Sequence, residues 1–262
     1  MKSIASRQNP IVARYRSAAR GEAADLVLLD GVHLVTEALA AGVPIHDVAI
    51  ANNAMTRGDV QAVVGALADR GVDFVTVSAP VIDALSPVRS SSPIVALAAR
   101  PSNDEARPYR GAVPLVVIAV DVQDPGNVGA IVRVAEAAGA TGVVAAGASA
   151  DPLGWKALRG SMGSGLRLPV ATTADVDAAV AAARSQRCRI VATVARGGRS
   201  FFEADYTGAV AILIGGEGSG LTEPMLAAAD ECVTIPMRPP VESLNAAVTA
   251  AVIVYEARRQ RS

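Results

Sequence analysis

The chain has 262 residues, enough for one large domain or two small ones, and 51% of them are hydrophobic. This content predicts a packed core, yet no apolar run reaches membrane-spanning length, so we expect a soluble protein without a membrane partner. The opening residues are polar and basic rather than the apolar block of a secretory signal, which favours the cytoplasm. Two cysteines, Cys188 and Cys232, and two histidines form no metal-binding pattern, so no metal site is expected.

The net charge of −1 argues against a generally basic nucleic-acid-binding surface, but the basic residues are unevenly distributed. Three segments concentrate them: Lys2, Arg7, Arg14, Arg16 and Arg20 before the first acid, then Arg184, Arg187, Arg189, Arg196 and Arg199, and finally Arg258, Arg259 and Arg261. Such clusters predict local binding of a polyanion, with solvated surface arginines as the alternative. Because only 3% of residues are aromatic, a nucleic acid would be held through its backbone and shape rather than by base stacking.

The first 100 residues alternate short apolar runs with amphipathic stretches, which predicts a small layered α/β domain. The predicted elements, in chain order, are a helix at 11–20, a strand at 26–29, a helix at 33–40, a strand at 48–51, a helix at 60–70, a strand at 74–77, a helix at 81–85 and a strand at 94–98. The segment 101–112 combines two prolines with mixed charge and is predicted to be a linker to a second domain at 113–262.

The second domain begins with an apolar run at 115–120 that is typical of a strand buried on both faces. An Asp-Pro-Gly turn follows, and Asn127 is predicted to cap a helix that begins at Val128. Arg133 falls outside the apolar face of this helix and should point away from the core. The further predictions are a strand that starts at 143, a basic and glycine-broken segment at 156–167, a helix at 176–184 and a strand at 189–194.

The stretch 210–255 organises this domain. A buried strand at 210–214 leads into a glycine loop at 215–220, and a second strand is predicted at 232–237. A helix then opens with Ser243 as its N-cap. Its buried face is predicted from the spacing of the apolar residues Leu244, Val248, Ala251, Val252 and Tyr255.

The glycine loop is so poor in Cβ atoms that a ligand can approach its backbone closely. It has neither the phosphate-binding P-loop pattern nor the dinucleotide fingerprint G-x-G-x-x-G leading into a helix. Glu217 stands in its middle, and its carboxylate would repel a pyrophosphate. The loop therefore favours a ligand without phosphate or with a positive centre, with a strained turn as the alternative.

Three motifs occur in a fixed order: DVQDPGNVGAIVRVAEAAG at 121–139, IGGEGSGL at 214–221, and IPM with SLN within 235–245. Together they resemble the motifs of the SpoU (TrmH-like) branch of the SPOUT RNA ribose 2′-O-methyltransferases. The resemblance covers 115–260 and extends weakly to 6–10 and 30–39, which are similar to the ribosomal-protein-like RNA-binding domain of that family. The chain departs from the family at Gly216, where many members carry Asn, and at 246–249.

This resemblance implies a fold, a cofactor and an assembly. The fold would be a parallel sheet with a deep trefoil knot, which general topology rules would not predict. The cofactor would be S-adenosylmethionine, a sulfonium without phosphate, and members of the family are homodimers. The resemblance places these residues at the cofactor: Gly215, Gly216, Gly218, Ile235, Met237 and Leu244.

The resemblance also implies five catalytic residues, namely Asn127, Arg133, Glu217, Ser243 and Asn245. Arg133 would bind the phosphate and the 2′-oxygen in the active site of the neighbouring subunit, a role that suits a fixed guanidinium, and a role as general base stays open. Ser243 and Asn245 would orient the hydroxyl, and Glu217 would position neighbouring groups. Simple N-capping by Ser243 and Asn127, and a surface ion pair between Arg133 and Glu136, are the structural alternatives.

The predicted function is S-adenosylmethionine-dependent methylation of RNA ribose, and the two-domain layout favours ribosomal over transfer RNA. Arg7, Arg14 and Arg16 are the predicted RNA-binding residues. A catalytically silent RNA-binding relative remains open, although all five polar residues are retained. A nucleotide-binding oxidoreductase is disfavoured by the missing phosphate fingerprint. The sequence does not identify the target nucleotide.

Overall fold

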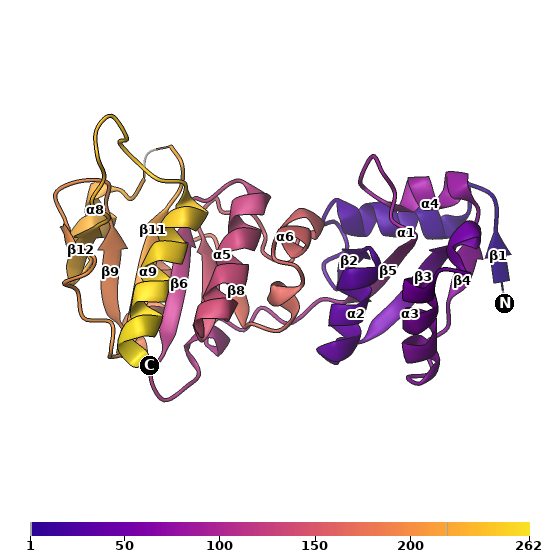
Figure 1. Ribbon diagram of the computed structural model, residues 1–262, viewed down its shortest axis with the longest axis horizontal. Helices are drawn as coiled ribbons and strands as arrows, with labels where there is room; N and C mark the ends of the chain where they lie inside the picture. The colour runs from indigo at the N-terminus through magenta and orange to yellow at the C-terminus, as the bar shows by residue number, and fades with distance from the viewer. Residues whose placement is uncertain (1, 219) are drawn as a thin grey trace. The chain divides into compact units, whose positions relative to one another are not determined.

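The computed structural model describes residues 2–218 and 220–262, so Ser219 of the glycine loop and Met1 lie outside the described residues. The chain divides into two compact units (Figure 1). Unit 1 comprises residues up to Ser102 together with Leu153–Leu166, and unit 2 comprises Asn103–Pro152 and Arg167–Ser262. In the described part, no helix is long and apolar enough to cross a membrane.

Unit 1 contains a five-stranded mixed sheet in the order β1-β4-β3-β5-β2. Its strands are β1 (Lys2–Ile4), β2 (Leu26–Asp30), β3 (Ile45–Ala51), β4 (Val75–Val77) and β5 (Ile94–Ala99). Its helices are α1 (Pro10–Ala19), α2 (Val32–Ala40), α3 (Gly58–Ala68), α4 (Ala79–Leu85) and α6 (Trp155–Gly160), with 3-10 turns η1 (Asn52–Ala54) and η3 (Ser164–Leu166). All eight predicted elements of this region are present. The three-residue strand β1, which pairs with β4, is too short to leave a sequence pattern.

The segment Leu153–Leu166 belongs to unit 1 although the sequence prediction included it in 113–262. Helix α6 packs against β2, and its Ala157 and Leu158 are buried. Arg159 pairs with the buried carboxylate of Asp30 at 2.5 Å, and Asp30 also accepts a hydrogen bond from Ser86 Oγ at 3.1 Å. The chain thus leaves unit 2, contributes a helix to unit 1 and returns.

Unit 2 contains a seven-stranded parallel sheet in the order β10-β12-β9-β11-β6-β7-β8. Its strands are β6 (Leu115–Val120), β7 (Gly142–Ala146), β8 (Val170–Thr173), β9 (Arg189–Thr193), β10 (Arg199–Ser200), β11 (Val210–Gly215) and β12 (Glu231–Thr234). Its helices are α5 (Pro125–Ala138), α7 (Val176–Ser185), α8 (Glu223–Ala227) and α9 (Ala246–Arg261), with the 3-10 turn η2 (Arg107–Tyr109). The predicted α/β fold with a parallel sheet is confirmed.

The central strands of unit 2 are covered on both faces. Helices α5 and α9 lie side by side on one face (Figure 1), and α5 contacts β6 and β7 while α9 contacts β11. A buried apolar cluster that includes Val116 and Ile118 of β6 and Val180 of α7 occupies the other face. Tyr109, from the predicted linker, is buried in this same cluster. The proline-containing segment therefore packs into unit 2 at η2.

The start of each site-bearing helix differs from the prediction. Asp124, not Asn127, is the N-cap of α5, and it accepts a hydrogen bond from Asn127 N at 2.9 Å. Asn245, not Ser243, is the N-cap of α9, and its Oδ1 accepts from Ala247 N and Val248 N at 2.9 and 3.2 Å. Both sites offered several possible caps, and the residue that directly precedes the first helical residue, Asp124 or Asn245, takes the role.

The predicted buried face of α9 is also wrong. Val248 and Tyr255 are 48% and 49% exposed. The helix instead buries its alanine-rich side, namely Ala246, Ala247, Ala250, Ile253, Val254 and Ala257. Small side chains let α9 lie close to α5, and this packing overrides the spacing of the larger apolar residues.

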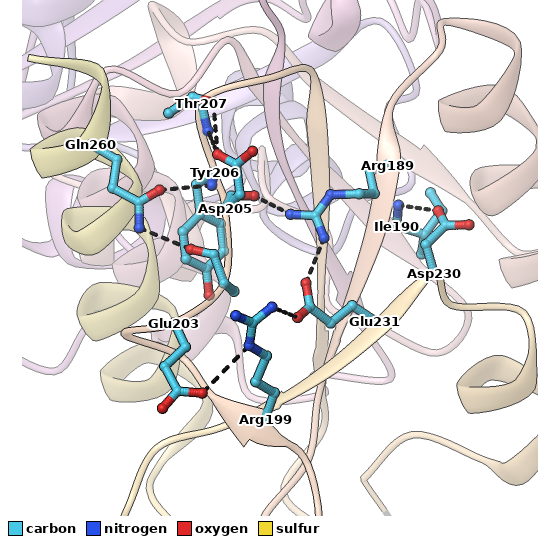
Figure 2. A network of polar contacts seen from close by, with 11 residues as sticks. Arg189, Ile190, Arg199, Glu203, Asp205, Tyr206, Thr207, Asp230, Glu231 and Gln260 are labelled. Carbon is cyan, nitrogen blue, oxygen red and sulfur yellow. Dashed lines mark hydrogen bonds and ion pairs between the residues drawn. The ribbon is translucent and has the colours of Figure 1, made fainter.

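Four of the five arginines in the second basic cluster, namely Arg184, Arg189, Arg196 and Arg199, pair with acids of the same unit, and Figure 2 shows the pairs of Arg189 and Arg199. Arg189 of β9 donates to Glu231 of β12 at 2.5 Å and to the carbonyl oxygen of Asp205. Arg199 also reaches Glu231, at 3.2 Å. The acids that pair with these arginines are distant in the sequence. A stretch of sequence without acids therefore does not have to form a surface with excess positive charge. Arg189 and Arg199 therefore join strands and do not support the predicted polyanion site.

Arg261 fastens the end of α9. Its guanidinium donates to four backbone carbonyl oxygens, those of Tyr206 at 2.7 Å, Val113 at 3.0 Å, Pro114 at 3.3 Å and Gly208 at 2.5 Å. The neighbouring Gln260 adds bonds to Tyr206 N at 2.8 Å and Ala204 O at 2.9 Å. The C-terminal helix is thus tied to both the segment before β6 and the loop before β11.

We expect Arg261→Ala to lower the free energy of unfolding by about 2 kcal/mol, because charged hydrogen bonds to carbonyl groups are lost. Arg258→Ala is the matched control, since Arg258 is exposed and makes one bond of 3.5 Å to Ala137 O. Arg258→Ala should lower the free energy of unfolding by less than about 0.5 kcal/mol. Urea unfolding of the two variants side by side measures the difference, and equal midpoints would contradict the anchoring role.

Candidate active site

Four loops of unit 2 follow the carboxyl ends of its parallel strands. They are the loops after β6, β9, β11 and β12, and β6, β11, β9 and β12 are consecutive in the sheet. In open α/β sheets, ligands bind at this edge. The predicted motifs at 121–127, 214–221 and 235–245 occupy three of these four loops.

Three of the predicted catalytic side chains meet at this edge. Asn127 Nδ2 donates a short hydrogen bond to Glu217 Oε1. Asn245 Nδ2 donates to Asn127 Oδ1 at 3.0 Å and lies 3.4 Å from Glu217 Oε1. Residues far apart in sequence thus form one polar cluster, which we call the Asn–Glu–Asn cluster.

The helix caps explain why these side chains are available. Because Asp124 caps α5, the Asn127 side chain is released from capping and reaches Glu217. Asn245 does both tasks, since its Oδ1 caps α9 while its Nδ2 enters the cluster. An amide has one acceptor and one donor end, so asparagine suits this double role.

Two adjoining pockets lie beside the cluster. The first is mainly apolar, with a cavity of about 120 Å³ lined by Thr193, Val194, Ala195, Ile214, Gly215, Gly220, Val233, Ile235, Met237, Ser243, Leu244, Ala246, Thr249 and Ile253. The second is more polar and is lined by Val194, Ala195, Gly216, Glu217, Gly218, Gly220, Leu221, Ser243, Leu244 and Asn245. The six residues predicted to bind the cofactor all line one or both pockets. Ser243 lies between them, exposed and outside the Asn–Glu–Asn cluster.

The steric surroundings differ among the glycines of the loop. A Cβ at Gly215 would lie 2.7 Å from the carbonyl carbon of Gly220, and Gly216 bridges to Gly220, so Gly215 and Gly216 lie directly against Gly220. At Gly218 a Cβ would meet nothing within 4 Å. Protein packing therefore requires glycine at 215 but not at 218, where only a ligand would require bare backbone.

Three pocket residues, the last of β9 and the two that follow it, were missed by sequence reasoning. Thr193, Val194 and Ala195 line the apolar pocket, and Thr193 Oγ1 donates to Leu213 O at 2.9 Å. Their only signal in the sequence is position, because they lie at the carboxyl end of β9, a parallel strand next to β11. The small and apolar residue types at these positions carry no motif.

Arg133 lies exposed on α5 and contacts none of the cluster residues through an ion pair or hydrogen bond in the described chain. The alternative interpretation, a surface ion pair with Glu136, is wrong. Glu136 instead pairs with Arg167, whose Nε and Nη2 both lie 2.8 Å from its carboxylate. The Arg133 guanidinium therefore has no acidic partner among the described residues.

The predicted RNA-binding arginines all lie exposed in unit 1. Arg7 Nε donates to Pro80 O at 2.7 Å, and Arg16 Nε donates to Ala84 O at 3.2 Å. Arg14 pairs with Asp47. Among the described residues, no acid pairs with Arg7 or Arg16, so their positive charge is not offset.

Known protein families match both parts of the chain. The model of the SpoU rRNA methylase family matches residues 114–255, and that of the thiostrepton-resistance methylase N terminus matches 1–110. An uncharacterised tRNA/rRNA methyltransferase of Synechocystis is 32% identical over 99% of this chain and 94% of its own length. The 23S rRNA (guanosine(2553)-2′-O)-methyltransferase RlmP of Bacillus subtilis is 28% identical over 88% of each chain.

A solved structure has the same fold throughout. The SpoU methyltransferase AviRb from Streptomyces viridochromogenes, in complex with the cofactor AdoMet, superposes with a TM-score of 0.86. The match covers 97% of this chain and 98% of that chain, at 27% identity. With one family model covering more than half of the residues and a relative above 30% identity over nearly the whole chain, the chain belongs to the SpoU rRNA methylase family of RNA methyltransferases.

Proposed function

We propose that this protein transfers a methyl group from S-adenosylmethionine to a ribose 2′-hydroxyl of RNA, with ribosomal RNA as the substrate class. The observation that carries the proposal is the Asn–Glu–Asn cluster beside an apolar pocket. RlmP, named as a 2′-O-methyltransferase of 23S rRNA, supports the reaction and the substrate because its similarity spans both units.

The pocket residues fit the cofactor. S-adenosylmethionine supplies an electrophilic methyl group and carries no phosphate. The apolar lining from Ile235, Met237 and Leu244 suits an adenosyl group, and the Glu217 carboxylate lies where a positive centre is favoured and a phosphate is repelled. The open space at Gly218 leaves the loop backbone accessible to such a ligand.

The polar side chains of the site are suited to activating a ribose 2′-hydroxyl, which is a weak nucleophile. A ribose 2′-hydroxyl reacts poorly unless it is aligned and its developing negative charge is stabilised. Asn127 and Asn245 provide amide donors held in place by Glu217, and Ser243 adds a hydroxyl on the pocket rim. The cluster thus orients the hydroxyl, while a guanidinium is needed for the adjoining phosphate.

We assign that guanidinium to Arg133 of a second copy of the chain. Arg133 is exposed and has no acidic partner in the described chain, and α9 beside it exposes Val248 and Tyr255. An exposed apolar face next to an uncompensated arginine is suited to a two-fold homodimer interface. Each dimer then contains two active sites, and each site takes Arg133 from the opposite subunit.

The deep trefoil knot is also proposed for unit 2. Its support is the family resemblance together with the path of the C-terminal segment, since 235–245 lines the pocket jointly with the loops after β9 and β11. The chain trace in a crystal structure would test it.

The experiment that tests the function compares RNA from a deletion strain with RNA from the parent. We expect one 2′-O-methyl mark on ribosomal RNA to be missing, and the purified protein with S-adenosylmethionine to restore it. Blocking the 2′-oxygen prevents its attack on the next phosphodiester, so the mark is mapped as resistance to alkaline cleavage. A mark missing from transfer RNA instead would change the substrate, and an unchanged set of 2′-O-methyl marks would reject the function.

Unit 1 is proposed to bind the RNA backbone through Arg7, Arg14 and Arg16. Removing residues 1–100 would not test this cleanly, because Leu153–Leu166 would lose the surface it packs against. Substitution is the better approach. Because Arg7 and Arg16 are unpaired with acids whereas Arg14 pairs with Asp47, the first two should contribute most.

Arg7→Ala with Arg16→Ala should weaken RNA binding and reduce the slope of log affinity against log salt by about 1.5 to 2, one phosphate contact for each arginine. Arg20→Ala is the control, since Arg20 pairs with Glu22 at 2.6 Å and its charge is already offset. Binding titrations at several salt concentrations measure both. Equal slopes for the double variant and the wild type would place the RNA elsewhere.

A further inference from the structure

Asp121, the first residue after β6, has a backbone conformation that few non-glycine residues adopt. Its φ is 55°, in the left-handed region, which Asp and Asn tolerate better than other side chains. Its N–H donates to Ala146 O at 3.2 Å, and its Oδ1 accepts from Ala148 N at 2.7 Å. The chain is therefore turned sharply where it leaves the sheet, and the turn is held by the Asp121 carboxylate.

Two glycines contact this residue, one at its side chain and the other at its backbone. A Cβ at Gly147 would overlap the carboxylate of Asp121, and a Cβ at Gly216 would overlap its carbonyl oxygen. Gly216 immediately precedes Glu217 in the glycine loop. The backbone of Asp121 is thus in direct contact with the loop that carries one member of the Asn–Glu–Asn cluster.

A second set of contacts fixes the next residue. Ser149 Oγ accepts from Val122 N at 2.9 Å and donates to Ala119 O at 3.0 Å. Ala150 N donates to Val122 O at 2.9 Å. The turn 147–150 therefore holds residues 121 and 122 at several points, and two residues later Asp124 begins the cap that presents Asn127.

We propose that Asp121 is a positioning residue for methyl transfer, which rests on the function proposed above. It sets Asn127 through the turn at 121–124 and Glu217 through its carbonyl contact with Gly216. Asp121 itself lines neither pocket, so it acts through these two residues. The distance between the amide of Asn127 and the cofactor loop then depends on one left-handed aspartate.

Three substitutions separate the contribution of the Asp121 hydrogen bond to Ala148 N from that of the left-handed backbone. Asp121→Asn retains an oxygen for Ala148 N and tolerates the left-handed backbone, so it should retain most of the activity. Asp121→Gly tolerates the left-handed backbone but has no oxygen for Ala148 N. Asp121→Ala has no such oxygen and does not favour the left-handed backbone. For Asp121→Ala we expect kcat to fall about 10- to 100-fold, as for a misplacement on the scale of 1 Å, with a smaller loss for Asp121→Gly. Unfolding midpoints and the folded fraction are measured for each variant.

Asp175→Ala is the matched control. Asp175 is likewise an aspartate of unit 2 that accepts a backbone N–H, from Ala178 at 3.1 Å, but it caps α7. It should lose stability with kcat per folded molecule unchanged. A merely structural Asp121 would behave in the same way, and that result, or an inactive Asp121→Asn, would overturn the proposal.

Gly216→Ala tests the contact from the other side. The added methyl must displace Asp121 O, so kcat should again fall, and the loss in the double variant with Asp121→Ala should be smaller than the product of the single losses. Gly208→Ala, where a Cβ meets nothing within 4 Å, controls for glycine replacement. Independent, multiplying losses would contradict the coupling. A wild-type protein that transfers no methyl group in the same assay would instead reject the proposed function.

Discussion

Asn127→Ala is expected to reduce kcat for methyl transfer about 100- to 1000-fold while leaving the affinity for S-adenosylmethionine close to that of the wild type. The size follows from the loss of one preorganised donor at a developing oxyanion. The affinity for S-adenosylmethionine should be unaffected because of where Asn127 lies. Asn127 lines neither pocket, yet its side chain bonds to both other members of the Asn–Glu–Asn cluster.

The helix should survive this substitution. Asp124 caps α5 and accepts from the backbone N–H of residue 127, which alanine retains. Asn103→Ala is a suitable control, because Asn103 also makes two hydrogen bonds, both to the backbone of Thr172 at 2.8 and 2.9 Å. It should affect stability alone. Calorimetry with S-adenosylmethionine and single-turnover methyl transfer separate the two effects, and an Asn127→Ala enzyme with wild-type kcat would remove Asn127 from the chemistry.

The elements of the fold were largely predictable because their patterns are local. Apolar runs such as 115–120 and 210–214 mark strands buried on both faces, and the structure places them as neighbours in the sheet. The missed strands β1, β8 and β10 have two to four residues, too few for a period to show. The strand order cannot be read from any local pattern.

Helix α9 shows where periodicity misleads. The face predicted to be buried carries Val248 and Tyr255, which are exposed, whereas the alanine-rich face with Ile253 and Val254 is buried and α9 packs against α5. Hydrophobic spacing does not distinguish burial within one chain from burial between two chains. The exposed Val248 and Tyr255 are therefore the part of the pattern that a monomer leaves unexplained.

The structure brings three of the five predicted catalytic residues together, but their local roles at the helix starts were not predictable. The motifs placed Asn127, Glu217 and Asn245 together, yet which residue caps which helix depended on backbone conformation at Asp124 and Asn245. Asp121 shows the same limit, since its left-handed turn and its contact with Gly216 join residues that are far apart in the sequence.

Mixing Arg133→Ala with Asn245→Ser is expected to restore methyl transfer to about a quarter of the wild-type level, although each variant alone is nearly inactive. Serine at 245 retains an N-cap oxygen for α9 but does not reach Asn127 or Glu217, so the helix persists while the cluster is lost. Random pairing makes about half of the dimers mixed, as expected for a two-fold symmetric assembly. In each mixed dimer one site has both residues and the other has neither.

The structure supplies an internal control for this experiment. Asn127 and Asn245 bond to each other within one chain, so they belong to the same site. Mixing Asn127→Ala with Asn245→Ser therefore leaves every site defective, and no activity should return. Recovery in this second mixture would mean that the two subunits exchange segments rather than side chains.

The decisive quantity is the activity of the first mixture relative to the mean of its two components, after subunit exchange has been verified with differently tagged chains. Arg133 is exposed on α5 and bonded to none of the cluster residues, whereas Asn245 is fixed in the cluster by hydrogen bonds to Asn127 and Glu217. If Arg133 served the site of its own chain, every site in the mixture would lack one residue. Activity no higher than that mean would then exclude the shared site and assign Arg133 to the active site of its own chain.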